Sequence, residues 1–403
     1  MKVAVIGAGL SGICTALCLA RLGHETEVFE RAPSVASEAS FAGAGLLSPL
    51  PLNSLDAPAS WAEQVTHFRA RLRSRRDREA RIEAQRLRQR QIKALTELGQ
   101  EVRGGLRLDL DQTQGWLILL PDARSLTTIE PDLHGAAALG VAHAHLTASQ
   151  ARDIEPGLHA ESAFDSALHL PDVTVLNPRQ LAQQLRLTAE QAGAVFRLGV
   201  DVLKVQPGSP VTLTWASKTE PGDAQTRPFD AVVICTGHLS QSLVPATGST
   251  LALRTLAGAC LTVPLPHSEA FDDLGPRSAV SDIRLGVTMT RMGQRVRISQ
   301  RLRHAPGTAK AASAATESLH KALAHWFPGV RSPQPAQFWQ SGVSMGADGA
   351  PLLGAAGAAG VWLNLGHGHQ GTALALGCAE WLAATMSGHT PEAEATALRP
   401  DRD

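Results

Sequence analysis

The chain has 403 residues, 44% of them hydrophobic, and its 37 Lys and Arg residues balance its 37 Asp and Glu residues. This length predicts two domains, and the lack of net charge argues against nucleic acid as a partner. No apolar run reaches the roughly 20 residues of a membrane span, and the first expected strand begins at residue 2, which leaves no room for a signal peptide. We therefore expect a cytoplasmic protein.

Cysteine usage also limits the class of protein. Five cysteines occur in apolar surroundings and without the spacing of metal ligands. An odd number of such residues is typical of reduced core thiols, so we expect neither disulfides nor a metal site. These residues are Cys14, Cys18, Cys235, Cys260 and Cys378.

The N-terminal segment has the pattern of a dinucleotide cradle. A short buried strand over 2–6 leads to Gly7, Gly9 and Gly12, where the chain must turn sharply, approach a pyrophosphate and pack a helix against the strand. The helix expected over 9–20 directs its unpaired N–H groups at the phosphates.

A second strand, over 26–30, follows this helix and ends in an acidic residue. Glu30 lies where a carboxylate binds a ribose 2′-hydroxyl and repels a 2′-phosphate. Strand, glycine turn, helix, second strand and acid together predict bound FAD and disfavour NADP. We assign the FAD contacts in this part of the chain to Gly7, Gly9, Leu10, Ser11, Gly12, Glu30, Arg31 and Ser40.

Arginines recur between Arg69 and Arg90, which predicts a basic amphipathic helix. Its polar face could attract anionic lipid or a partner protein. A solvated helix, partly balanced by nearby acidic side chains, is the favoured alternative, so membrane contact stays open. The expected inward stripe consists of Leu72, Ile82, Leu87 and Ile92.

Two later segments add to the predicted cofactor site. A helix over 181–193 and a strand over 194–205 precede a buried strand over 230–235 that leads into Thr236 and Gly237. Such a strand returns the chain beneath the nucleotide.

The second of these segments is a strand from Val361, a glycine-rich turn and an Ala- and Leu-rich helix that ends at 387–388. The N-terminus of this helix could stabilise reduced flavin at its pyrimidine edge. Two histidines in the turn are candidate donors or acid–base groups, or alternatively hydrogen-bonded structural residues. We assign FAD contacts to Thr236, Gly237, Gly366, His367, Gly368, His369, Gln370 and Gly371.

The order of these motifs resembles the D-amino-acid oxidase-like FAD-dependent flavoproteins, and most closely the bacterial D-amino-acid dehydrogenases and glycine oxidase. The resemblance spans nearly the whole chain and rests on the opening fingerprint together with segments 39–49, 155–158, 170–172, 177–178, 232–237 and 366–371. It implies an α/β fold with a discontinuous, Rossmann-like FAD-binding domain and an α+β substrate domain whose antiparallel sheet covers the flavin. The FAD-binding domain would comprise 1–55, 146–239 and 336–403, and the substrate domain 56–145 and 240–335.

The resemblance also implies cofactor contacts and a reaction. Val202 would bind the adenine through its backbone, and Ala44, Gly45, Leu46 and Leu47 would lie beside the flavin ring near N5. The family transfers a hydride from the carbon that bears a neutral amine to flavin N5, and water hydrolyses the resulting imine. Orientation is the main contribution of the protein.

The substrate motif departs from the family pattern. Val343 stands where the family has the arginine that binds the substrate carboxylate, and segment 257–259 reads Ala-Gly-Ala where the dehydrogenases have Lys-Gly-Tyr. The chain contains no tyrosine. A valine cannot replace a guanidinium that binds a carboxylate through two hydrogen bonds.

Two interpretations follow from this departure. Another cation could bind the carboxylate, and Arg301 in the arginine-rich strand over 294–303 is the candidate, although these arginines could equally face solvent on an edge strand. Alternatively, the substrate is a larger amine, an amino-acid conjugate or a biosynthetic intermediate held by shape. The pattern slightly favours the second interpretation. Arg301, His367 and His369 are therefore the candidate catalytic residues.

The sequence thus predicts an FAD-dependent oxidoreductase that oxidises a C–N bond of an amine or amino-acid-derived substrate. A flavin monooxygenase that uses NAD(P)H is disfavoured, because the C-terminal turn has Gly-His-Gly in place of Gly-Asp. A non-catalytic flavoprotein subunit is the other alternative, suggested by the altered substrate motif. The electron acceptor, oxygen or a quinone, and the oligomeric state stay open. The segment from Thr390 onward is expected to be a frayed tail.

Overall fold

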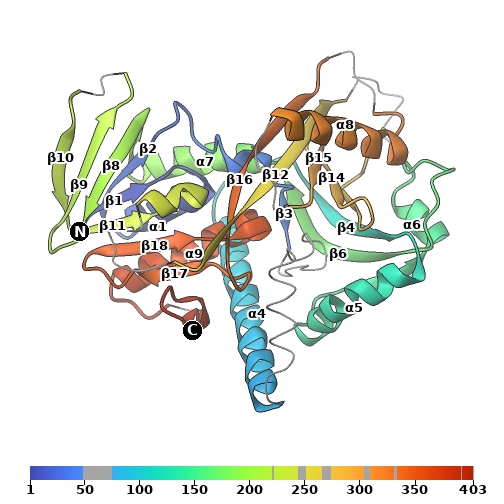
Figure 1. Ribbon diagram of the computed structural model, residues 1–403, viewed down its shortest axis with the longest axis horizontal. Coiled ribbons are helices and arrows are strands. Elements are labelled where there is room, and N and C mark those ends of the chain that lie inside the picture. The colour runs from blue at the N-terminus through green and yellow to red at the C-terminus, as the bar shows by residue number, and fades with distance from the viewer. Residues whose placement is uncertain are drawn as a thin grey trace.

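The computed structural model describes residues 1–48, 75–219, 222–243, 251–265, 274–303, 309–330, 334–391 and 393–402. A six-stranded sheet forms one half of the molecule (Figure 1). Its order is β17 (Leu352–Ala355), β18 (Val361–Leu365), β11 (Ala231–Ile234), β1 (Lys2–Ile6), β2 (Glu25–Glu30) and β7 (Val195–Leu198). All neighbours are parallel except β17 and β18.

Alternation along β1 explains why this sheet is covered on both faces. Val3 and Val5 face a core formed with the helices α1 (Leu10–Arg21), α7 (Pro178–Gln191) and α9 (Gly371–Met386). Ala4 and Ile6 face the opposite core. That second core is shared with a three-stranded antiparallel sheet of β8 (Val200–Gln206), β9 (Val211–Ser217) and β10 (Gln225–Phe229).

A nine-stranded sheet forms the other half, and its strands come from several separate parts of the chain. Its order is β16 (Gln337–Gly346), β12 (Leu253–Pro264), β15 (Arg295–Gln300), β14 (Val287–Arg291), β13 (Ala279–Asp282), β4 (Gln112–Leu120), β6 (Ser166–Leu176) and β3 (Leu46–Leu47), with β5 (Ala144–Thr147) paired to β6. The sheet is antiparallel except between β4 and β13. Helices α6 (Ala148–Ile154) and α8 (Ala309–Trp326) pack on one face and α5 (Ala123–Ala138) on the other.

The predicted strand over 194–205 is wrong as a single element. The chain forms β7 and then β8, and these strands belong to different sheets. Gly199 separates them with φ +69°, a left-handed conformation that glycine adopts without a Cβ clash. Alternating hydrophobicity continues across this break, so the pattern alone did not reveal it.

The expected domain boundaries cut across the sheets. Strands β3, β6 and β16 belong to the nine-stranded sheet, although their residues fall in ranges that we expected in the FAD-binding domain. Long-range strand pairing, which sequence order does not report, places them there. The division of the chain into domains stays a prediction.

We expected the basic helix to begin near Arg69, which lies outside the described residues. Within them, α4 runs over Arg75–Gly104. Leu72 lies outside the described residues, and the inward stripe is wrong for Ile82 and Leu87, which are 43% and 36% exposed. The helix is longer than expected, and its N-terminal half projects away from both sheets (Figure 1). The C-terminal half packs against α9 and buries Ile92 and Leu95.

The C-terminal segment is docked, which contradicts the expected frayed tail. Ala395 and Leu398 are buried, and Arg402 Nη2 donates to Asp348 Oδ1 at 2.9 Å. Apolar burial and this ion pair compensate the cost of ordering the segment. The composition of the segment did not indicate the partner surface on α4 and β17.

Helices α4 and α9 cross so closely that a side chain does not fit between them. A Cβ on Gly377 would lie 1.7 Å from the Leu95 carbonyl oxygen, and one on Gly99 would lie 2.8 Å from the Gly377 nitrogen. We predict that Gly377→Ala destabilises the protein by about 1–3 kcal/mol because the helices must separate. Gly104→Ala, at the end of α4 and in open space, is the control and should leave the unfolding midpoint almost unchanged. Equal midpoints for the two variants would contradict the close crossing.

Candidate active site

A large cavity extends from the carboxyl ends of β1, β2 and β11 to the nine-stranded sheet. Open α/β sheets bind ligands at such a point, where successive connections leave in opposite directions. Most of the residues predicted from the sequence line this one cavity: Gly7, Gly9, Leu10, Ser11, Glu30, Arg31, Ser40, Ala44, Leu46, Val202, Thr236, Gly237, Gly366, His367, Gly368, His369, Gln370, Gly371 and Arg301.

Three predicted cofactor residues support the wall of the cavity instead of lining it. A Cβ on Gly12 would lie 1.8 Å from the Gly7 carbonyl oxygen, so glycine is required where α1 packs under the turn. Gly45 has φ +76°, and a Cβ there would lie 1.9 Å from the Leu176 carbonyl oxygen. Leu47 is buried in the short strand β3.

The first turn of α1 borders the cavity. Gly9 precedes the helix and supplies no side-chain cap, and the Leu10 nitrogen donates to Ser40 Oγ at 3.0 Å. The helix dipole at this end favours an anion. Glu30 is held at the end of β2, where its carboxylate accepts from the Ala8 nitrogen at 2.6 Å and the Ala32 nitrogen at 2.7 Å. The arrangement matches the one predicted from the sequence.

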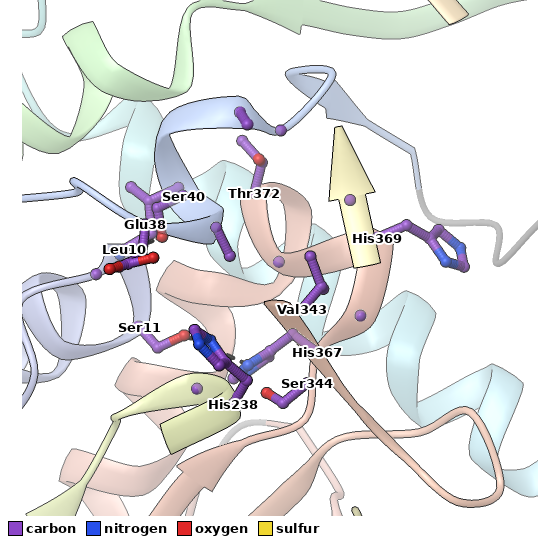
Figure 2. A pocket seen from close by; sticks show the side chains of 18 of the residues that line it. Leu10, Ser11, Glu38, Ser40, His238, Val343, Ser344, His367, His369 and Thr372 are labelled. Carbon is purple, nitrogen blue, oxygen red and sulfur yellow. Dashed lines mark hydrogen bonds between the residues drawn. The ribbon is translucent and has the colours of Figure 1, made fainter. Parts of the chain in front are cut away.

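The end of β18 and the turn that follows it contain three buried polar atoms of interest. Asn364 Oδ1 in β18 and His367 Nε2 and Gln370 Nε2 in the turn have no hydrogen-bond partner in the described part of the chain. Buried polar atoms are normally paired, so these three indicate a ligand with polar groups. His367 Nδ1 lies 3.3 Å from Ser11 Oγ, which ties the turn to the start of α1 (Figure 2).

The two predicted histidines lie in different surroundings. His367 is buried, and burial lowers the pKa of its imidazole to about 4, so the ring is neutral at physiological pH. His369 also borders the cavity, but its side chain is exposed and points away from His367 (Figure 2). A neutral imidazole inside the site is a hydrogen-bonding group and not a fixed charge.

The nine-stranded sheet closes the cavity with a largely apolar wall. Val343 of β16 projects into it (Figure 2) and lies close to Gly258 of β12, where a Cβ would be 3.2 Å from Val343 Cγ2. Ala259 of β12 also lines the cavity. The alternative that the arginine-rich strand is an edge strand is wrong, since β15 lies between β12 and β14. Arg301 follows this strand, lines the cavity and donates from Nη2 to the Ile283 carbonyl oxygen at 2.8 Å.

Sequence reasoning missed a polar group on the same wall. His238 follows Thr236 and Gly237, and its ring packs on Gly342, where a Cβ would lie 2.7 Å from the ring. Burial lowers the pKa of His238, so this imidazole is also held toward its neutral form. Its position directly after the predicted Thr-Gly turn was the available signal.

Glu38 was missed as well. Its carboxylate accepts from Ser341 Oγ at 2.6 Å and from Arg31 Nη2 at 3.1 Å. Burial by itself raises the pKa of Glu38, but the hydrogen bonds from Ser341 and Arg31 and the charge of Arg31 bring it below its usual value. Glu38 thus connects β2 to β16 across the cavity. Its place one residue before the segment 39–49 was the signal.

Comparison with known proteins identifies the family to which the chain belongs. The family model described as DAO, FAD dependent oxidoreductase, matches residues 2–385. The chain belongs to this family. It is 31% identical to a D-amino acid dehydrogenase of Cereibacter sphaeroides, over 100% of this chain and 95% of that protein. It is 28% identical to a D-amino acid dehydrogenase of Methylobacterium radiotolerans, over 97% of each.

Solved structures of low sequence identity share the fold of this DAO-family chain. Glycine oxidase from Geobacillus kaustophilus superposes with a TM-score of 0.75 at 21% identity, covering 100% of this chain and 98% of that structure. Iminodiacetate oxidase from Chelativorans sp. BNC1 gives 0.72 at 21% identity, covering 99% of each. The predicted α/β fold with a partly antiparallel sheet is confirmed.

FAD is the cofactor of this DAO-family oxidoreductase, as predicted. The chain fits it, because the cradle at Gly7 and Gly12 has no room for a Cβ. The buried polar atoms of Asn364, His367 and Gln370, which lack partners among the described residues, border the same cavity. Glu30 would hold the adenosine ribose, α1 the pyrophosphate, and the turn before α9 the flavin.

We predict that Gly12→Ala weakens FAD binding. The added Cβ would lie 1.8 Å from the Gly7 carbonyl oxygen, so the cradle must move to make room for it, at a cost of about 1–3 kcal/mol. This cost corresponds to a Kd for FAD that is roughly 5- to 150-fold higher. Titration of the apoprotein with FAD measures this Kd, and circular dichroism verifies that the variant is folded. A folded variant that binds FAD as tightly as the wild type would contradict the placement of the cradle.

We predict that His367 makes stability depend on pH. The unfolded chain takes up a proton near pH 6.5, whereas the buried ring resists protonation down to about pH 4. Stability is therefore lost as the pH falls through this window, by roughly 3 kcal/mol in total. Urea unfolding of the apoprotein should show a shallower pH dependence for His367→Asn. His369→Asn, in the exposed neighbour, should keep the dependence of the wild type, and identical slopes for all three proteins would refute the assignment.

Proposed function

We propose that the chain oxidises a C–N bond of an amino acid or amine to an imine, with FAD as the hydride acceptor. One observation carries this proposal: the dinucleotide cradle and the apolar wall of the nine-stranded sheet enclose the same cavity. The names of the relatives support the substrate class, since they include D-amino acid dehydrogenase, glycine oxidase and iminodiacetate oxidase.

The residues of the chain contribute orientation and electrostatics to this reaction. When bound, FAD supplies the two-electron acceptor for the hydride that leaves the carbon next to nitrogen. Segment 44–48 and the sheet wall shape the space for the substrate. The backbone donors at the start of α9 favour negative charge in the turn 366–370. The neutral His367 connects that turn to Ser11 of α1 through its Nδ1.

We propose that Arg301 binds the carboxylate of an amino-acid substrate in this chain. The guanidinium lies against Gly286, since a Cβ built on that glycine would be 3.3 Å from Arg301 Nε. Arg301 lines the cavity, to which Val343 of β16 contributes an apolar side chain and no charge. Ser299, two residues earlier, also lines the cavity, and its buried Oγ has no hydrogen-bond partner within the described ranges. A guanidinium beside a hydroxyl donor is a suitable pair for a carboxylate.

A larger amine or an amino-acid conjugate held by shape is the second candidate. The apolar wall of Gly258, Ala259 and Val343 favours it, because small side chains leave space where the substrate lies. A flavin monooxygenase and a non-catalytic subunit are further outcomes that the experiment below separates.

We also propose a cytoplasmic location, supported by five buried thiols that suit a reducing compartment. None of the helices in the described ranges combines the length and the apolar composition of a bilayer-crossing segment. Contact of α4 with a membrane stays open, and so do the electron acceptor and the oligomeric state.

Anaerobic titration with D-amino acids and with amines that lack a carboxylate tests the reaction. We predict that at least one class bleaches the oxidised flavin absorbance near about 450 nm, a general property of flavins. Bleaching by NADH alone would indicate the monooxygenase, and bleaching by neither would indicate the non-catalytic subunit.

The same titration with variants tests whether Arg301 anchors the substrate by binding its carboxylate. If an amino acid is the substrate, Arg301→Met should raise its Kd by roughly 10- to 150-fold, since a charged hydrogen-bonded pair is worth about 1.5–3 kcal/mol. Arg303→Met, in an exposed arginine on the same segment, is the matched control and should bind as the wild type does. If Arg301→Met leaves the Kd unchanged, Arg301 is not the anchor.

A further inference from the structure

Arg297 is a buried cation whose partners are neutral. The residue lies in β15 and is 3% exposed. Its Nη1 donates to the Phe41 carbonyl oxygen at 2.6 Å and to the Gly43 carbonyl oxygen at 3.1 Å, and its Nε donates to Thr262 Oγ1 at 3.1 Å. Among the described residues, no carboxylate is within ion-pair distance of it. A guanidinium keeps its proton in proteins, so a full positive charge lies inside the molecule.

The groups around Arg297 increase the net positive charge. Arg297 lies against the ring of Phe41, with Cζ 5.3 Å from the centroid, and Arg179 also contacts that ring, at 5.1 Å. Arg295 is a third nearby cation. Cys260 is the acidic group that faces the guanidinium, but burial raises the pKa of its thiol to about 11, so it stays neutral. Isolated charges are costly to bury, and this one calls for an anion that the described part of the chain does not supply.

The position of Arg297 indicates which anion it stabilises. Gly43 and Ala44 line the cavity, and the guanidinium lies directly behind the carbonyl group of Gly43. The Gly43–Ala44 peptide is trans, so the N–H of Ala44 points away from Arg297. Arg297 therefore fixes the orientation of this peptide dipole. The positive end of the dipole, the Ala44 N–H, points away from the guanidinium, and the peptide belongs to a segment that borders the FAD cavity.

We propose that Arg297 is a positioning residue that favours the reduced, anionic form of the flavin. Two-electron reduction with uptake of one proton leaves one additional negative charge on the flavin ring. The buried guanidinium and the peptide that it orients favour that charge in a region of low dielectric constant. In the proposed function the electrons come from the substrate, so the inference builds on that function. Its test needs bound FAD and no substrate.

The test is the midpoint potential of bound FAD, measured anaerobically by equilibration with a reference dye. Arg297→Gln removes the charge and should lower the potential by about 30 mV or more, which is a tenfold change in the two-electron equilibrium. Arg295→Gln, in an exposed arginine two residues earlier on the same strand, is the matched control: solvent screens its charge, so it should lower the potential far less than Arg297→Gln does. An unchanged potential in Arg297→Gln would overturn the proposal.

Arg297→Lys separates the charge from a merely structural role. A buried lysine keeps the charge at low pH and loses it as the pH rises, because desolvation lowers the pKa of the ammonium group. The variant should therefore match the wild-type potential at low pH and fall below it as the pH rises, with a step that the wild type lacks. A variant without this step, or one with the potential of Arg297→Gln at every pH, would show that Arg297 acts through packing alone. If Arg297→Gln does not fold, this lysine variant decides the question.

If the chain oxidises no amine, the potentials still test the inference, because the dye titration requires only bound FAD. Conversely, an active enzyme whose potential does not respond to Arg297 would overturn the inference and leave the proposed function intact.

Discussion

The attachment of segment 37–43 to the nine-stranded sheet is the constraint on which the cavity depends. Trp339 Nε1 donates to the Ser37 carbonyl oxygen, Ser341 donates to Glu38, and Arg297 donates to the carbonyl oxygens of Phe41 and Gly43. The segment itself begins just after β2 of the six-stranded sheet. These bonds therefore join the two sheets through one short stretch of chain, and the space enclosed between them contains both the dinucleotide cradle and the substrate wall.

The glycines make this enclosure possible because they let backbone approach backbone. Gly7 and Gly12 bring α1 under the turn that follows β1, and Gly45 brings the segment after α2 (Ala39–Ala42) against β6. The ionisable groups around the cavity are of two kinds. Imidazoles at His238 and His367 are kept neutral by burial, whereas the guanidinium of Arg297 keeps its charge and relies on carbonyl dipoles. The site thus combines neutral hydrogen-bonding groups with one buried cation behind the wall.

The sequence was informative where the chemistry is local and uninformative where it depends on distant strands. The strand, glycine turn, helix and acid of residues 2–30 lie next to one another in the chain, so their geometry could be predicted. The alternation of arginines over 294–303 was visible, but not that β15 lies inside the sheet or that segment 41–43 packs against the Arg297 guanidinium. The same limit applies to α4. Its buried half depends on the close contact between Gly99 of this helix and Gly377 of α9, which is far away in the sequence.

A crystal structure of the FAD complex would show whether the two sheets enclose the flavin. We predict that the isoalloxazine lies between segment 44–47 and the turn 366–370, with His367 Nε2 or Gln370 Nε2 donating to it and the adenosine ribose at Glu30. These two nitrogens, which lack partners in the described chain, would then be satisfied. A flavin ring bound outside the space between the two sheets, or a complex in which both nitrogens stay unpaired, would contradict the account.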